Sequence, residues 1–214
     1  MSDSQMVILL DDDPAMRRSL SLALELAGYV VQAHGSAEEL FDAIQPEQSG
    51  CLLLDLKMPG MDGLAVQEEL QARGCTLPVI FISAFGDIPS TVRALKAGAV
   101  DFVEKPFSTE ALLARVEEAF AEDSRQRDQY ALQGRIASQI RELTPRELEV
   151  MQFVTEGLSN KEIARELGIS PRTVEKYRAR VMEKMRADSI ADLCQMVATA
   201  PDAVGNGREL GSDI

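Results

Sequence analysis

The chain has 214 residues, 45% of them hydrophobic and 27% charged, which excludes a fibrous or wholly disordered protein and allows one large or two modest domains. No apolar run approaches the roughly 18 residues that cross a membrane, and the first residues lack a signal peptide's basic and apolar segments, so we expect a cytoplasmic protein with no membrane partner. The three cysteines (Cys51, Cys75 and Cys194) are odd in number and widely spaced, which disfavours a disulfide scaffold and a structural zinc site.

The net charge of −13 is unevenly distributed along the chain. Residues 1–122 contain 20 acidic and 8 basic residues, whereas residues 140–200 contain 10 of each. Within the second block, six basic residues fall between Arg172 and Arg186. An acidic half followed by a half with one basic helix predicts two modules with different functions.

Residues 1–122 alternate short apolar segments with helix signals, the pattern of a parallel α/β sheet. Pro14 stands at a first helical position, and Ser36 with Glu39 forms a capping box. Five strands predict a doubly wound fold whose site lies at the carboxyl ends of the strands. We expect strands at residues 6–10, 29–33, 51–54, 79–82 and 100–103, and helices at 14–27, from 36, 64–73, 90–97 and from 109.

Residues 123–140 are expected to form a helical linker, because residues 111–139 contain no proline and only one glycine, Gly134. A loose apolar stripe fits a helix that pairs with a second copy, but a lone solvated helix or a flexible tether fits equally well. The stripe consists of Ala119, Phe120, Ala131, Ile136, Ala137 and Ile140.

Residues 141–200 have the signals of a four-helix domain, and residues 201–214 are expected to be a disordered tail. Two capping boxes and two further helix-starting serines divide the domain into helices, and Gly168 ends the second of them. The helix-starting residues are Thr144 (with Pro145 and Glu147), Ser159 (with Glu162), Ser170 (with Pro171) and Ser189.

Polar side chains follow the strands of the predicted sheet: Asp11-Asp12-Asp13 after the first, Asp55 after the third, Ser83 after the fourth and Lys105 after the fifth. Crowded carboxylates repel and need a cation, and Mg²⁺ prefers such oxygen ligands. One carboxylate can then act as a nucleophile towards phosphorus, with a hydroxyl and an ammonium group holding the phosphoryl oxygens. Taken singly, Asp13 is better explained as a helix N-cap and Lys105 as a surface lysine, and it is the occurrence of all these residues at different strand ends that favours a site.

Residues 6–121 resemble the CheY-like receiver domain of bacterial two-component response regulators. The matching runs are LDDD (10–13), LDLKMPGMDG (54–63), ISA (82–84) and DFVEKPF (101–107). The resemblance implies that Asp55 is the phosphoacceptor and that a cis bond precedes Pro106. It also implies that Mg²⁺ is held by Asp11, Asp12, Asp55 and the Lys57 carbonyl, that Ser83 and Lys105 contact the phosphoryl group, and that Phe102 turns inward on activation. Phe102 is otherwise explained as a core residue.

The basic segment forms an amphipathic helix with one apolar face made of Val174, Tyr177, Val181 and Met185. Arg178 lies near that face and is expected to extend its head towards water. A short preceding helix and a tight turn at Gly168 make a helix-turn-helix, which reads bases with the start of its second helix. A basic helix that only keeps a small bundle soluble is the alternative.

Residues 143–200 resemble the DNA-binding domain of the LuxR/FixJ/NarL class. The matching runs are LTPRE (143–147), GLSNKEIA (157–164) and ISPRTVE (169–175), while GDIP (86–89) and KAGA (96–99) favour the FixJ branch. The resemblance implies that the last helix forms a dimer contact. It also implies that Glu175, Lys176 and Ala179 face bases, and that Lys161, Arg172, Thr173 and Arg180 contact phosphates.

The sequence is therefore interpreted as a bacterial response regulator rather than an enzyme. A sensor histidine kinase would phosphorylate Asp55, and a dimer would bind an inverted repeat at a promoter and, with RNA polymerase, activate transcription. Whether phosphorylation acts by dimerisation or by relief of inhibition stays open.

Two other functions are considered. The first is an aspartate-dependent phosphohydrolase, which is disfavoured because Lys57 stands where such enzymes have a second Asp. The second is a DNA-binding protein whose first half is only a scaffold. His34 is expected on the surface, away from the site.

Overall fold

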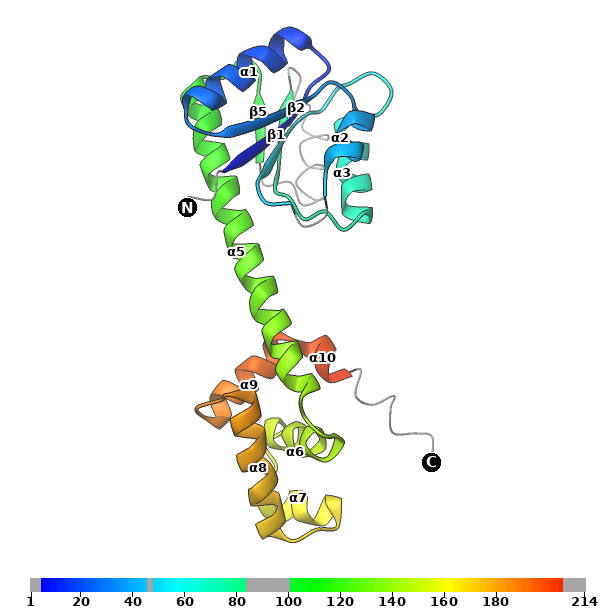
Figure 1. Ribbon diagram of the computed structural model, residues 1–214, viewed down its shortest axis with the longest axis vertical. Coiled ribbons are helices and arrows are strands. Elements are labelled where there is room, and N and C mark those ends of the chain that lie inside the picture. Colours follow the sequence, from blue (N-terminus) through cyan, green and yellow to red (C-terminus); the bar gives the residue numbers. More distant parts are fainter. Residues whose placement is uncertain (1–4, 46–47, 84–100, 206–214) are drawn as a thin grey trace. The chain divides into compact units, whose positions relative to one another are not determined.

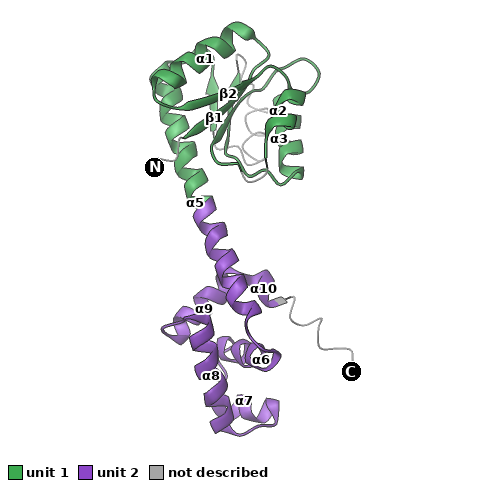
Figure 2. Ribbon diagram, viewed as in Figure 1, with its two compact units in different colours: residues 1–126 green, residues 127–214 purple. Residues whose placement is uncertain are grey.

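The computed structural model describes residues 5–45, 48–83 and 101–205, which belong to two compact units, Met1–Gln126 and Arg127–Ile214 (Figure 2). No helix among these residues is long and apolar enough to cross a membrane. In unit 1 the elements are β1 (Met6–Leu10), α1 (Pro14–Leu26), β2 (Val30–His34), α2 (Ala37–Ala43), β3 (Cys51–Asp55), α3 (Gly63–Ala72), β4 (Val79–Ser83), β5 (Asp101–Glu104) and the first part of α5 (Thr109–Arg141). In unit 2 they are the rest of α5, α6 (Pro145–Thr155), α7 (Asn160–Leu167), α8 (Pro171–Met185), α9 (Ile190–Thr199) and α10 (Pro201–Gly205).

Unit 1 is built on a five-stranded parallel sheet with the order β2-β1-β3-β4-β5. Alternate strand residues face opposite sides, and each side is covered by helices (Figure 1). Helices α1 and α5 cover the side that contains Leu9, Leu53 and Ile80. Helices α2 and α3 cover the other side, which contains Leu10, Leu54 and Phe81. Because both sides are buried, the three central strands β1, β3 and β4 consist of nearly continuous apolar residues, whereas the edge strands β2 and β5 also contain polar residues.

The predicted sheet is confirmed, and its strand boundaries agree with the structure to within one residue. The predicted helix at residues 90–97 lies outside the described residues, as do the two runs at 86–89 and 96–99. At the start of α2, Ser36 caps the helix as predicted, but the Glu39 carboxylate accepts from the N–H of Gly35 at 2.8 Å rather than from that of Ser36. The predicted capping box is thus only half formed.

Unit 2 starts its helices at the predicted residues. Thr144 and Ser159 each head a complete capping box, and Ser170 and Ser189 cap α8 and α9. Gly168 ends α7 with φ 65°, a left-handed conformation that glycine adopts at little cost. These caps depend on contacts within four residues, which explains why the local sequence predicts them well.

The apolar stripe predicted for the linker helix is divided between the two cores. Ala119 and Phe120 pack in the core of unit 1, and Ile136 and Ile140 pack in the core of unit 2. The stripe is therefore not a free face, and its main apolar residues are unavailable for pairing with a second copy.

Residues 201–205 correct the prediction of a tail that is disordered from residue 201. They form the short helix α10, and Ala203 and Val204 pack against the core of unit 2. Pro201 suits a first helical position, a signal that the composition-based prediction passed over. Residues 206–214 lie outside the described part of the chain.

Candidate functional sites

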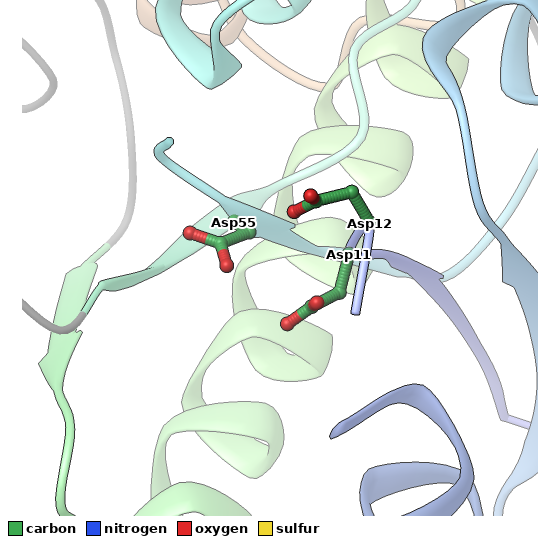
Figure 3. A group of neighbouring side chains, drawn as sticks. All are labelled: Asp11, Asp12 and Asp55. Carbon is green, nitrogen blue, oxygen red and sulfur yellow. The ribbon is translucent and has the colours of Figure 1, made fainter. Parts of the chain in front are cut away.

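Three carboxyl groups meet at the carboxyl ends of β1 and β3. Each of Asp11, Asp12 and Asp55 offers one oxygen atom, and these oxygens all lie within 4.8 Å of one another (Figure 3). Asp11 is buried at 1% exposure, whereas Asp12 is exposed. The parallel sheet brings β1 and β3 side by side, which places residues 44 positions apart in the chain in one cluster.

Lys105 supplies the positive charge of this cluster. Its Nζ donates to Asp55 Oδ2 at 2.9 Å and to Asp11 Oδ2 at 3.2 Å. Burial on its own would lower the pKa of Lys105, but the hydrogen bond and charge of Asp55, together with Asp11, raise it above its usual value. Lys105 therefore stays protonated while it holds two carboxylates. The bond between Lys105 and Pro106 is cis, as expected.

Asp11 is held by its own loop as well as by Lys105. Its Oδ1 accepts from the N–H of Asp13 at 2.8 Å, and its carbonyl oxygen accepts from the Arg17 guanidinium at 2.7 Å. Burial raises the pKa of Asp11, while the Asp13 N–H and Lys105 oppose that shift. Asp13 itself caps α1 by accepting from the N–H of Ala15, so the ordinary explanation of this residue is confirmed.

Asp55 ends β3, and 12% of its side chain is exposed to solvent. Its Oδ1 accepts from the N–H of Lys57 at 3.1 Å. This hydrogen bond and the one from Lys105 fix the orientation of the carboxyl group. Lys57 lies two residues after Asp55, the last residue of β3, and is exposed.

Ser83 and Phe102 lie on the two neighbouring strands. Ser83 ends β4 and is buried at 1% exposure, and its carbonyl oxygen accepts from the N–H of Lys105 at 2.8 Å. This bond ties the ends of β4 and β5 together. Phe102 is half-buried on β5 and packs against the core cluster beneath α2 and α3.

The donor set of the acidic cluster fits a hard divalent cation. Three carboxylates stand together with one ammonium group, so negative charge remains in excess. Mg²⁺ binds one or two carboxylates and keeps several waters, which suits a cluster in which Asp11 and Asp55 are largely buried and Asp12 is exposed.

The prediction that His34 lies on the surface and away from the site is wrong. It is buried at 8% exposure, and its carbonyl oxygen accepts from the N–H of Asp11 at 3.4 Å. Burial lowers the pKa of His34. The observed strand, Val30–His34, ends one residue later than the predicted one, so His34 lies within β2, where it pairs with Leu10 of β1, rather than after the strand.

The helix-turn-helix of unit 2 is made by α7, the turn at Gly168 and α8. The predicted apolar face of α8 is confirmed, since Val174, Val181 and Met185 are buried. All seven predicted DNA contacts lie on these two helices, and six of them are exposed while Thr173 is half-buried. The exposed six are Lys161, Arg172, Glu175, Lys176, Ala179 and Arg180.

Two long-range interactions hold this surface, and sequence reasoning did not find either of them. Lys184 Nζ donates to Glu147 Oε2 at 2.6 Å and to the Glu142 carbonyl oxygen at 3.0 Å. Burial on its own would raise the pKa of Glu147, but Lys184 and the capping contacts of Thr144 hold it below its usual range.

The second interaction joins α8 to the start of α7. Arg178 donates from Nη1 to Asn160 Oδ1 at 2.7 Å. The expected extension of Arg178 away from the apolar face was a partial signal for this contact. Its partner could not be found, because it lies 18 residues away.

Comparison with known proteins assigns both units. Residues 7–117 match the response regulator receiver domain, and residues 141–197 match the bacterial regulatory proteins of the luxR family. The transcriptional regulatory protein FixJ of Azorhizobium caulinodans is 43% identical over 208 residues, covering 95% of this chain and 99% of the relative. Nodulation protein W of Bradyrhizobium diazoefficiens is 44% identical over 198 residues, covering 92% of this chain and 87% of the relative.

Solved structures give the same result. The response regulator StyR has a TM-score of 0.78 at 40% identity, covering 91% of this chain and 98% of that chain. Full-length FixJ from B. japonicum has a TM-score of 0.57 at 40% identity, covering 92% of this chain and 98% of that chain.

Proposed function

The chain belongs to the response regulators that join a receiver domain to a LuxR-type DNA-binding domain, and from this membership we propose that it is a transcriptional regulator switched by phosphorylation of Asp55. The observation that carries the proposal is the position of the Asp55 carboxylate. It stands at the end of β3, partly open to solvent, with Lys105 at 2.9 Å and a second buried carboxylate beside it. A sensor histidine kinase is the partner that fits this site.

In the proposed transfer, an oxygen of Asp55 forms a bond to phosphorus while the bond between phosphorus and the kinase histidine nitrogen breaks. The leaving imidazole keeps the electron pair. Lys105 is placed to neutralise charge on the phosphoryl oxygens, and the buried Ser83 hydroxyl stands at the end of the neighbouring strand to hold one of them. Such fixed charges are the main protein contribution to phosphoryl transfer.

Mg²⁺ is the proposed cofactor, held by Asp11, Asp12, Asp55 and the carbonyl oxygen of Lys57. When bound, the ion neutralises charge on the phosphoryl group. The chain itself orients these carboxylates: the backbone N–H groups of Asp13 and Lys57 donate to Asp11 and Asp55, and the Arg17 side chain donates to the Asp11 carbonyl oxygen.

Phosphorylation would be read out through Ser83, Lys105 and Phe102. A phosphoryl group on Asp55 competes for the ammonium group that now also contacts Asp11. Movement of the Ser83 and Lys105 region, which one backbone hydrogen bond already couples, would let Phe102 turn inward. A local change of charge thus shifts an element between two positions.

The output we propose is DNA binding by a homodimer at an inverted repeat in a promoter, followed by activation of transcription with RNA polymerase. Glu175, Lys176 and Ala179 would face base edges, and Lys161, Arg172, Thr173 and Arg180 would contact phosphates. The exposure of all of these except the half-buried Thr173 on α7 and α8 supports this assignment. Ala179 offers only a methyl group, so apolar contact with thymine is expected there.

The proposal is tested by incubating the chain with Mg²⁺ and acetyl phosphate and measuring its intact mass. The wild type should gain one phosphoryl group, and Asp55→Asn should gain none. Asp62→Asn is the matched control, since Asp62 caps α3 in the next loop and asparagine caps helices equally well. Equal phosphorylation of Asp55→Asn, or sustained hydrolysis of a phosphate ester by the wild type, would contradict the proposal.

A further inference from the structure

Arg178 lies on the face of α8 whose other residues are buried in the core. It lies four residues after Val174, three before Val181 and seven before Met185, and all three of these are at most 1% exposed. Residues at such spacings share one face of a helix. Arg178 itself is half-buried, because its aliphatic stem continues this face.

The head of Arg178 makes a directional contact with the start of α7. Its Nη1 donates to Asn160 Oδ1 at 2.7 Å. Among the described residues, this neutral amide is the polar partner of the guanidinium, and no carboxylate forms an ion pair with it. The contact therefore ties two helices together without neutralising the charge, which distinguishes it from the Lys184–Glu147 pair.

Helix α7 needs such a contact because it is short. It has eight residues, too few to be stable or oriented on its own. Its end is fixed by the turn at Gly168, and its middle is fixed by the buried Ile163 and Ala164. Its first residue, Asn160, is tied to α8 by Arg178.

We propose that Arg178 is a positioning residue for DNA binding: its hydrogen bond to Asn160 holds the start of α7 against α8. The bond sets the position of Lys161, which directly follows Asn160, relative to the exposed Glu175 and Lys176 of α8. Without this bond, the start of α7 samples other positions, and only a fraction of the molecules has α7 and α8 arranged for DNA binding. Apparent affinity falls by that fraction. This inference rests on the proposed DNA-binding function.

The test compares wild type, Asn160→Ala, Arg178→Met and the double variant, all as phosphorylated full-length chain. The probe is a duplex selected by the wild type from a randomised pool. Met keeps the stem of Arg178 in its packing and removes only the head. Each single variant should lose affinity about tenfold, which corresponds to one charge-assisted hydrogen bond. The double variant should lose no more than either single one, because both remove the same bond.

Salt dependence separates positioning from a phosphate contact. Arg178→Met should keep the wild-type slope of log affinity against log salt concentration, since the number of phosphate contacts in the complex is unchanged. Arg180→Met, which removes an exposed arginine of the same helix, should lower that slope by about one. A lower slope for Arg178→Met, with wild-type affinity for Asn160→Ala, would overturn the proposal in favour of direct phosphate contact. Wild-type affinity in both variants, or additive losses, would overturn it too.

Hydrogen exchange provides a readout that does not depend on DNA. In both single variants the amide of Ile163, which donates to the Ser159 carbonyl in the first turn of α7, should exchange faster. The amide of Val181 in α8 should exchange as in the wild type, which also shows that the variants are folded. Unchanged exchange at Ile163 would overturn the proposal. If the wild type selects no duplex, the proposed function fails, and the exchange experiment still decides whether the bond positions α7.

Discussion

Each unit contains a lysine that binds a buried carboxylate, and the two lysines have different surroundings. In unit 1, Lys105 contacts both Asp11 and Asp55, which carry more negative charge than one ammonium group can neutralise. In unit 2, Lys184 contacts one carboxylate, Glu147, and a carbonyl oxygen, so its charge is matched. The first arrangement leaves an excess of negative charge, which suits the proposed binding of a cation. The second leaves no excess charge, and it lies in the unit whose predicted DNA contacts are mostly exposed.

The two units differ in which of their candidate functional residues are buried. In unit 1, Asp11 and Ser83 are buried and Asp12 is exposed, so the proposed phosphorylation site lies partly below the surface, where clustered carboxylates repel one another. In unit 2, six of the seven predicted DNA contacts are exposed, and the buried Glu147 is bound by Lys184. Breaking the matched pair of unit 2 should therefore destabilise that unit, whereas removing a carboxylate from the cluster of unit 1 should stabilise it.

The largest expected effect comes from Lys184→Met. The Glu147 side chain is only 3% exposed, and losing its partner leaves an uncompensated buried charge. Unit 2 should lose about 3 kcal/mol of stability. Calorimetry of the full chain measures this loss, and hydrogen exchange of α6 and α8 amides assigns it to unit 2.

The matched control is Arg146→Met, which breaks an exposed ion pair with Glu149 of similar length, 2.7 Å. This variant should change stability by less than about 0.5 kcal/mol. Equal losses for Lys184→Met and Arg146→Met would show that the Lys184 pair is not a structural support.

A smaller effect is expected when acid protonates Glu147, because a neutral carboxyl group replaces the pair without leaving a buried charge. The pKa of Glu147 is held below its usual 4.5, and so is that of the capping-box Glu162. A carboxyl group with a lowered pKa stabilises the fold above its unfolded-state pKa and loses this effect as pH falls through the folded value. Unit 2 should thus keep constant stability from about pH 7 to 5 and weaken below that.

Urea unfolding of the full chain across this pH range measures the effect, with exchange of α6 amides as the reporter. Glu147→Gln should flatten the profile, since it removes the main titrating group. A profile that is equally steep in Glu147→Gln would assign the acid sensitivity to other carboxyl groups.

The smallest effect, of opposite sign, is expected for Asp12→Asn. This change removes one of three clustered carboxylates, and Asp12 is exposed, so a chelator-treated sample should become more stable by at most about 1 kcal/mol. Added Mg²⁺ should stabilise unit 1 in the wild type and much less in the variant. Asp42→Asn, an exposed change on α2, should keep both the wild-type stability and the Mg²⁺ effect. Destabilisation of Asp12→Asn in chelator would contradict the excess of negative charge.

The sequence predicts those features that depend on neighbouring residues. The capping boxes at Thr144 and Ser159 and the left-handed Gly168 need contacts within four residues, and all three are found. The strand ends were also predictable from apolar runs, and the parallel topology then brings Asp11 and Asp55 together.

Features that depend on distant residues were missed or misassigned. The partner of Lys184 lies 37 residues away and that of Arg178 lies 18 away, so no local pattern shows either. His34 was misassigned because β2 ends one residue later than predicted, which places His34 in the sheet beside Leu10 rather than after the strand. Residues 201–205 are a helix because Ala203 and Val204 find a core to pack against, which composition alone does not reveal.

The central claim is that the charge state of Asp55 in unit 1 controls DNA binding by unit 2. Its most direct test is the affinity of the full chain for a selected duplex, measured with and without acetyl phosphate and Mg²⁺, for wild type and Asp55→Asn. Our account predicts that affinity rises on phosphorylation in the wild type only. Equal affinity of the wild type in both conditions would contradict it and would leave unit 1 as a scaffold.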